Sequence, residues 1–170
     1  MLKLSSRAHL VGVALLICGL AAATAEAQSP QPASPPAAPP SAAKQAVENR
    51  KAAYTLIGNY FRWFGGVAKG TIPYDEAEAT KRAMRIALLS GIVEDAFPDG
   101  SNAGEPESKA KPDVWSNRAD FDKKLKDFQA HAQALVDANA KEKGSTEAFK
   151  AAVATLAGDC KGCHETYKVK

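Results

Sequence analysis

The chain has 170 residues, with 22 Lys and Arg against 19 Asp and Glu, and 45% of its residues are hydrophobic. This near balance of charge differs from the strongly basic composition of nucleic-acid-binding domains, so we expect no nucleic-acid partner. The length suits a single folded domain with additional shorter segments.

Residues 1–27 have the features of a secretory signal peptide. A short start with two basic residues is followed by an apolar run over 10–23, and Ala25-Glu26-Ala27 fits an A-x-A cleavage site. Gln28 would then begin the mature chain, which we expect to be exported to a bacterial periplasm. An uncleaved membrane anchor is the alternative, but a run of about fourteen residues is short for a bilayer, which needs about twenty.

Residues 28–42 form a segment rich in proline and alanine, with six prolines. Such a composition predicts a disordered, extended linker, and a ligand for proline-recognition domains is the alternative. The folded domain is therefore predicted to cover 43–170.

Apolar residues recur every three or four positions in the first half of this domain, which predicts two helices. The first covers 43–69 and is ended by Gly65-Gly66, Gly70 and Pro73. The second opens at Tyr74-Asp75 and stops at Phe97-Pro98. The predicted inner faces carry Val47, Arg50, Tyr54, Ile57, Phe61 and Phe64 on the first helix, and Ala79, Ala83, Ile86, Ser90 and Val93 on the second.

The second half of the domain predicts two more helices. Asp113 is expected to cap the third, and Ser145 or Thr146 the fourth, after a break at Gly144. Four helices joined by short, longer and short loops predict an all-α fold, an antiparallel up-down four-helix bundle. The inner faces carry Phe121, Leu125, Phe128, Ala132 and Leu135 on the third helix, and Phe149, Val153, Leu156, Cys160, Cys163, His164 and Tyr167 on the fourth.

The fourth helix contains the motif Cys160-Lys161-Gly162-Cys163-His164. In this spacing two thiols can form thioether bonds to the vinyl groups of a haem while the imidazole binds its iron. A thioredoxin-type pair would need a neighbouring strand–helix unit, and a zinc site would need a second ligand pair. The only other cysteine is Cys18, and the only other histidines are His9 and His131. The motif therefore predicts one covalently attached haem c per chain.

Several segments together resemble the cytochrome c′ family, the class II cytochromes c. They are Asn49-Arg50-Lys51 with Tyr54, the stretch from Lys109 through Pro112 to Trp115, and the terminal C-x-x-C-H. The resemblance implies a covalently bound haem in a four-helix bundle, with His164 as the proximal iron ligand. The implied roles of the remaining residues are thioether attachment for Cys160 and Cys163, the propionate side for Arg50, Lys51 and Lys111, and the distal pocket for Tyr54.

The chain departs from the family pattern at the distal position, which is usually Leu or Phe in five-coordinate members and Met in low-spin relatives. Here it is Tyr54, and a neutral phenol is a poor iron ligand. Helical phasing places Met84 and His131 off the inner faces. We therefore expect five-coordinate, high-spin iron that binds small ligands such as NO and CO. A low-spin, six-coordinate iron with Met84 or His131 as its ligand is the alternative.

These features predict a periplasmic haem protein that transfers electrons, binds small gaseous ligands, or does both. A low-spin electron carrier is the alternative, and a peroxidase-type enzyme is disfavoured because it would need a distal His or Arg for acid–base chemistry. We expect a small redox protein or a membrane electron-transfer chain as partner. A homodimer through the first two helices is also expected, because Leu56, Tyr60, Met84 and Leu88 lie off their core faces.

Overall fold

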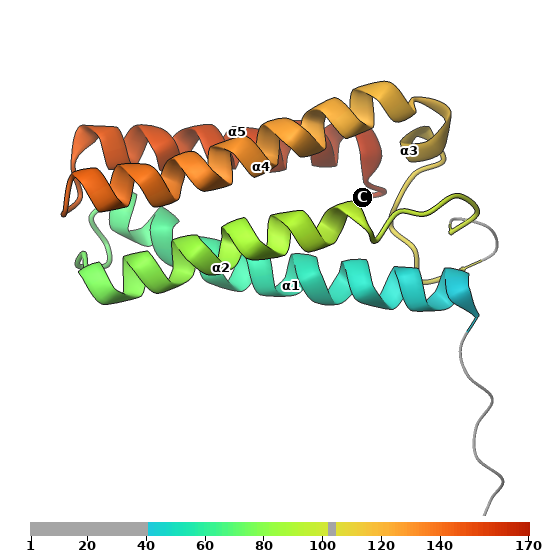
Figure 1. Cartoon of the computed structure of the whole chain (residues 1–170), viewed down its shortest axis with the longest axis horizontal. Coiled ribbons are helices and arrows are strands. Elements are labelled where there is room, and N and C mark those ends of the chain that lie inside the picture. The colour runs from blue at the N-terminus through green and yellow to red at the C-terminus, as the bar shows by residue number, and fades with distance from the viewer. Residues whose placement is uncertain (1–40, 102–104) are drawn as a thin grey trace, which may run out of the picture. The chain divides into compact units, whose positions relative to one another are not determined.

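The computed structural model describes residues 41–101 and 105–170, so the predicted signal peptide and nearly all of the predicted linker lie outside the described residues. The described part contains five helices and no strand. Its long helices run alternately up and down beside one another (Figure 1), which confirms the predicted antiparallel bundle. The helices are α1 (Ala42–Ala68), α2 (Glu76–Glu94), α3 (Asp113–Ser116), α4 (Arg118–Lys141) and α5 (Glu147–Tyr167).

Side-chain caps explain where three of the long helices begin. The Ser41 hydroxyl accepts a hydrogen bond from the Lys44 amide at 3.1 Å, so α1 begins one residue before the predicted domain boundary. Asp75 accepts from the Glu78 amide at 2.7 Å at the start of α2. Thr146, one of the two predicted caps, does the same for α5. Each cap satisfies an amide that has no partner within its own helix.

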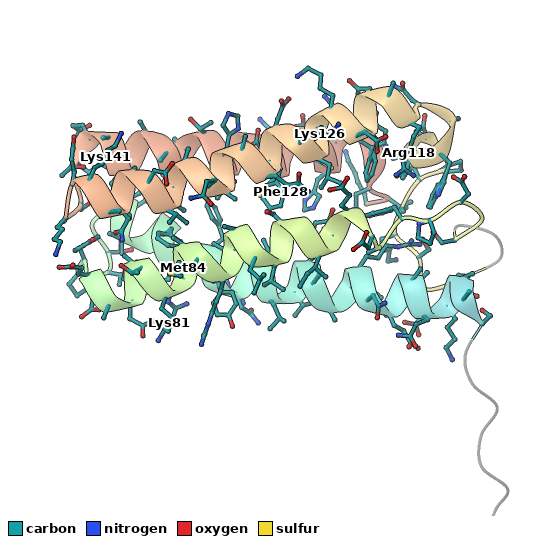
Figure 2. All side chains as sticks on the ribbon, viewed as in Figure 1. Lys81, Met84, Arg118, Lys126, Phe128 and Lys141 are labelled. Atoms are coloured by element: carbon teal, nitrogen blue, oxygen red, sulfur yellow. The ribbon has the colours of Figure 1, made fainter. Side chains whose placement is uncertain are left out.

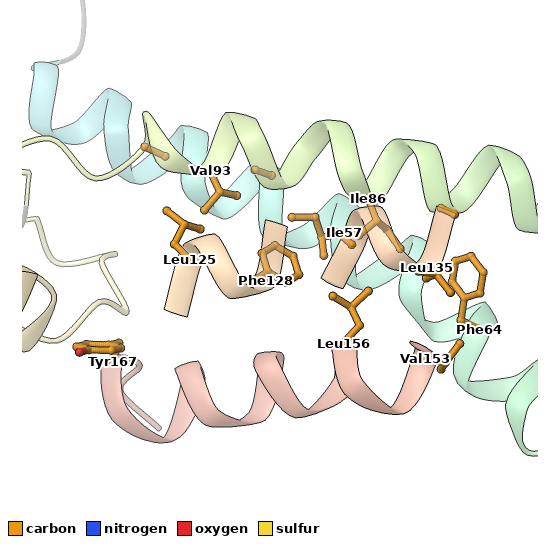
Figure 3. Close-up of a cluster of buried hydrophobic side chains, with 14 of the residues drawn as sticks. Ile57, Phe64, Ile86, Val93, Leu125, Phe128, Leu135, Val153, Leu156 and Tyr167 are labelled. Atoms are coloured by element: carbon orange, nitrogen blue, oxygen red, sulfur yellow. The ribbon is translucent and has the colours of Figure 1, made fainter. Parts of the chain in front are cut away.

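The periodic faces meet in the middle of the bundle. The whole predicted face of α2 and that of the third long helix are buried. Figure 3 shows that Phe64, Leu135 and Val153 lie at one end of this cluster, while Tyr167 lies at the other. Burying these apolar side chains is the main source of the bundle's stability, at about 1.5–3 kcal/mol for each fully buried large side chain.

The prediction of one continuous third helix capped by Asp113 was wrong. Asn117 (φ −120°, ψ 50°) separates α3 from α4, and Pro112 precedes α3 without a side-chain cap. Hydrogen bonds to the segment that follows α2 stabilise the break between α3 and α4. The Trp115 indole N–H donates to the Pro98 carbonyl at 3.1 Å, and Arg118 donates to the Phe97 carbonyl at 2.9 Å.

The last turn of α5 is held from two sides. The Lys111 amide donates to the Tyr167 carbonyl, and the Val169 amide donates to the Lys109 carbonyl, both at 2.9 Å. The Tyr167 hydroxyl donates to Asp120 Oδ2 on α4 at 2.6 Å. These bonds fix the end of the helix that carries the C-x-x-C-H motif. In the two described ranges, no helix combines the length and apolarity needed to cross a membrane.

Candidate functional site

A cavity of about 570 Å³ opens between α1, α4 and α5. Its volume lies within the usual range of ligand pockets, about 300–1,000 Å³. α1 and α5 pack less closely against each other than α2 packs against α1 or α4. α2 supplies none of the lining residues. The bundle is therefore closely packed along α2 and open between α1 and α5.

The motif residues lie together on the wall formed by α5. Cys160, Cys163 and His164 all line the cavity, because residues three and four apart share one face of a helix. Both thiols are half-buried, while His164 is exposed. Burial, followed by the positive charge of Lys168, lowers the pKa of His164. This favours the neutral imidazole, the form that binds metal ions.

The two thiols do not have the character of a redox pair. Burial raises the pKa of Cys160 to about 11, with Asp159 adding to the effect, and burial also raises the pKa of Cys163. Disulfide oxidoreductases instead lower the pKa of their attacking thiol. Both cysteines are free thiols. Their environment therefore suits two thiols that stay protonated beside an apolar cavity.

Arg50 lines the cavity from α1 and is 4% exposed. Its guanidinium donates to the Ala96 carbonyl at 3.1 Å, to the Ser101 hydroxyl and carbonyl at 3.1 and 2.8 Å, and to the Ser108 hydroxyl at 3.0 Å. Among the residues described, it forms no ion pair with a carboxylate. A buried cation without a counter-charge favours an anionic group from a bound molecule.

Replacing Arg50 by Met is expected to lower the free energy of unfolding of the holoprotein by about 2–3 kcal/mol. The change leaves the carbonyls of Ala96 and Ser101 without their charged donor. Urea denaturation measures the loss. Arg85→Met is the matched control, because Arg85 is exposed, does not line the cavity and, among the described residues, donates a hydrogen bond only to the Tyr60 hydroxyl. It is expected to cost no more than about 0.5 kcal/mol, and equal costs for the two variants would contradict this interpretation.

The lining of the cavity is apolar with a strongly basic border. Asp159 is the single carboxylate among the described residues that line it, against six basic side chains: Arg50, Lys51, Arg62, Lys109, Lys124 and Lys168. Lys51 forms an ion pair with Glu107. Lys111 lies outside the lining, and its ammonium group donates to the Glu165 carbonyl at 3.3 Å. The cavity therefore suits a large apolar molecule with anionic groups, and the structure brings Arg50 and Lys51 to it but not Lys111.

Tyr54 lies on the α1 wall, across the cavity from α5, and its ring contacts Phe97 edge-on with centroids 6.4 Å apart. Met84 and His131 do not line the cavity. Met84 is 58% exposed on α2, where Figure 2 labels it. His131 Nδ1 lies 2.7 Å from Asp159 Oδ2.

Sequence reasoning missed several residues around the site. Ser101 and Ser108 hold Arg50, Asp120 holds Tyr167, and Asp159 pairs with His131. All of these bonds join residues far apart in the chain, so the spacing of residues along the sequence does not predict them. The sequence signal for the Arg50 environment was the pair of aromatic residues Phe97 and Trp115, which flank the loop between α2 and α3. The Arg50 guanidinium lies over these two rings, 5.0 and 5.7 Å from their centroids.

Comparison with known proteins agrees with this site. The family model described as Cytochrome C' matches residues 45–168. The chain belongs to the cytochrome c′ family. It is 38% identical over 125 residues to cytochrome c' of Rubrivivax gelatinosus, covering 74% of this chain and 95% of that protein. It is 37% identical over 126 residues to cytochrome c-556 of Agrobacterium tumefaciens, covering 73% and 97%.

Solved structures of this family share the fold. Cytochrome c prime from Shewanella frigidimarina superposes with a TM-score of 0.71 at 36% identity, covering 78% of this chain and all of that chain. Cytochrome c' from Rubrivivax gelatinosus gives a TM-score of 0.69 at 34% identity, covering 75% and 97%. Membership of the cytochrome c′ family makes this chain a haem protein whose cofactor is covalently bound haem c.

The residues present fit this cofactor. An apolar cavity accepts the macrocycle, two protonated thiols lie on one wall of it, and a neutral imidazole lies beside them. The basic border, with the buried Arg50 that lacks a carboxylate partner in the described ranges, suits the two propionates of a haem. When bound, the haem supplies an iron that changes oxidation state and can accept a small ligand.

Proposed function

We propose that this chain carries one haem c on Cys160 and Cys163, with His164 as the iron ligand and the opposite iron face open to small ligands. Arg50 and Lys51 lie on the propionate side, where both line the cavity. Tyr54 lies over the open face, because α1 faces α5 across the same space. The iron is five-coordinate and high-spin, and it takes ligands such as NO and CO.

The observation that carries this proposal is the position of the alternative ligands. Met84 and His131 both lie outside the cavity lining, so of the described residues neither a thioether nor a second imidazole faces the haem site. Relatives support ligand binding at such a site. One solved structure is a nitric oxide complex of a variant of cytochrome c prime from Alcaligenes xylosoxidans, 30% identical with a TM-score of 0.67. Another is a carbon monoxide-bound variant of that protein, 30% identical.

Optical titration of the dithionite-reduced protein with carbon monoxide tests the function. A saturable change of the visible spectrum, with one CO bound per haem, is the expected result. A reduced spectrum that is low-spin and unaltered by CO would overturn the proposal and would favour the six-coordinate electron carrier.

We infer that the protein works without catalysing a substrate reaction. A peroxidase needs a distal acid–base group, and the Arg50 guanidinium already donates to Ala96, Ser101 and Ser108. Electron transfer accompanies ligand binding in this proposal, with a small redox protein or a membrane electron-transfer chain as partner. The exposed Leu56, Met84 and Leu88 on α1 and α2 form the proposed homodimer surface, which sedimentation of Leu88→Glu against the wild type would test.

We propose a periplasmic location, because haem attachment to C-x-x-C-H takes place outside the bacterial cytoplasm and the sequence begins with signal-peptide features. The mass of the intact protein from the periplasmic fraction is expected to equal a chain beginning at Gln28 plus one haem. A mass that retains residues 1–27 would instead support the membrane anchor.

A further inference from the structure

The Tyr54 hydroxyl differs from those of the other tyrosines. The chain has four tyrosines, all within the described ranges, and the other three have hydrogen-bond partners while Tyr54 has none there. The bonded hydroxyls are those of Tyr60 (accepting from Arg85 at 3.4 Å), Tyr74 (donating to Asn139 at 2.6 Å) and Tyr167 (donating to Asp120 at 2.6 Å).

This hydroxyl opens onto the cavity. In the described part of the chain, every side-chain polar atom that is sealed from open space has a hydrogen-bond partner. The Tyr54 hydroxyl has no partner, so it reaches open space, and the space that Tyr54 lines also contains Cys160 and Cys163. Burial raises the pKa of Tyr54, and the two thiols add to the effect. The phenol therefore keeps its proton and remains a donor.

The ring that carries this donor is held in place. Tyr54 packs edge-on against Phe97, and Phe97 is itself fixed between the Arg50 guanidinium at 5.0 Å and the Phe121 ring at 4.9 Å. The Arg50 donors on the same helix already serve Ala96, Ser101 and Ser108. Tyr54 is thus a fixed, neutral donor on the α1 wall of the cavity.

We propose that the Tyr54 hydroxyl donates a hydrogen bond to the ligand on the iron, so that the site favours anionic or strongly accepting ligands over carbon monoxide. This inference rests on the proposed function, since it needs an open iron face. A hydrogen bond to a charged acceptor strengthens binding by roughly ten- to a hundred-fold, whereas carbon monoxide is a weak acceptor and gains little. Tyr54 would then set which ligands the site selects as well as limit the space above the iron.

Fluoride is the probe that tests this donor, because it is a small anion and a strong acceptor. Dissociation constants are measured for fluoride with the ferric holoprotein and for carbon monoxide with the ferrous holoprotein. Tyr54→Phe removes only the hydroxyl and is expected to lower the preference for fluoride over carbon monoxide by roughly ten- to a hundred-fold. The charge-transfer absorption band of the fluoride complex is expected to shift in the same variant. Tyr60→Phe is the matched control, because Tyr60 does not line the cavity, and it is expected to change neither constant.

Equal changes of both dissociation constants in Tyr54→Phe, or no change in either, would overturn the hydrogen bond while the open iron site stands. A wild-type protein that binds neither fluoride nor carbon monoxide would instead refute the proposed function, and the hydrogen bond with it.

Discussion

Replacing Cys160 and Cys163 together by serine is expected to convert a haem that survives acid–acetone extraction into one that is extracted completely. A serine hydroxyl does not form a thioether with a vinyl group, so the double variant retains only the bond from His164 to the iron. Denaturation in acid breaks that bond because the imidazole becomes protonated. Haem absorbance in the precipitated polypeptide, before and after extraction, measures the effect.

The single variants and a control on the same helix sharpen this test. Cys160→Ser and Cys163→Ser each keep one thioether, so each is expected to retain its haem on extraction. Ala157→Ser introduces a hydroxyl on α5 outside the motif and is expected to behave as the wild type. Complete extraction of haem from the wild type would end the assignment of thioethers to these two residues.

Replacing Tyr54 by Met is expected to change the iron from high spin to low spin. The thioether would extend from the α1 wall into the cavity that holds both thiols and the imidazole. Methionine is flexible enough to find the sixth position, and Met with His is the usual ligand pair of low-spin cytochromes c. The visible spectrum of the reduced variant measures the change, together with a loss of carbon monoxide binding.

Tyr54→Leu is the matched control for this variant. Leucine also removes the phenol but carries no sulfur, so the iron is expected to stay high-spin and to bind carbon monoxide. A high-spin spectrum in Tyr54→Met would show that position 54 does not lie within reach of the iron, and the distal role of Tyr54 would fail.

The helices could be predicted because each long helix buries a single face. On α2, all five residues expected on the inner face are buried, from Ala79 to Val93. The break at Asn117 could not be predicted, because neither Gly nor Pro occurs between Pro112 and Gly144. It depends on the bonds from Trp115 and Arg118 to the carbonyls of Pro98 and Phe97. These partners are known only once the loop is folded.

In the candidate site too, residues on one helical face could be predicted, whereas contacts from distant segments could not. A helical spacing of three and four placed Cys160, Cys163 and His164 on one face, and the structure brings them to one cavity. The surroundings of Arg50 could not be predicted, since Ser101 and Ser108 reach it from a polar loop without periodicity. Lys111 shows the reverse case: it lies near the motif, but its ammonium group turns to the Glu165 carbonyl, away from the cavity lining.

Resonance Raman spectroscopy of the reduced wild-type protein tests the central claim most directly. The iron–histidine stretching band is seen only when a single histidine binds ferrous iron and the sixth position is empty. An open iron site predicts this band, together with five-coordinate high-spin marker lines, and its disappearance when carbon monoxide is added. Six-coordinate low-spin marker lines without an iron–histidine band would contradict an open site.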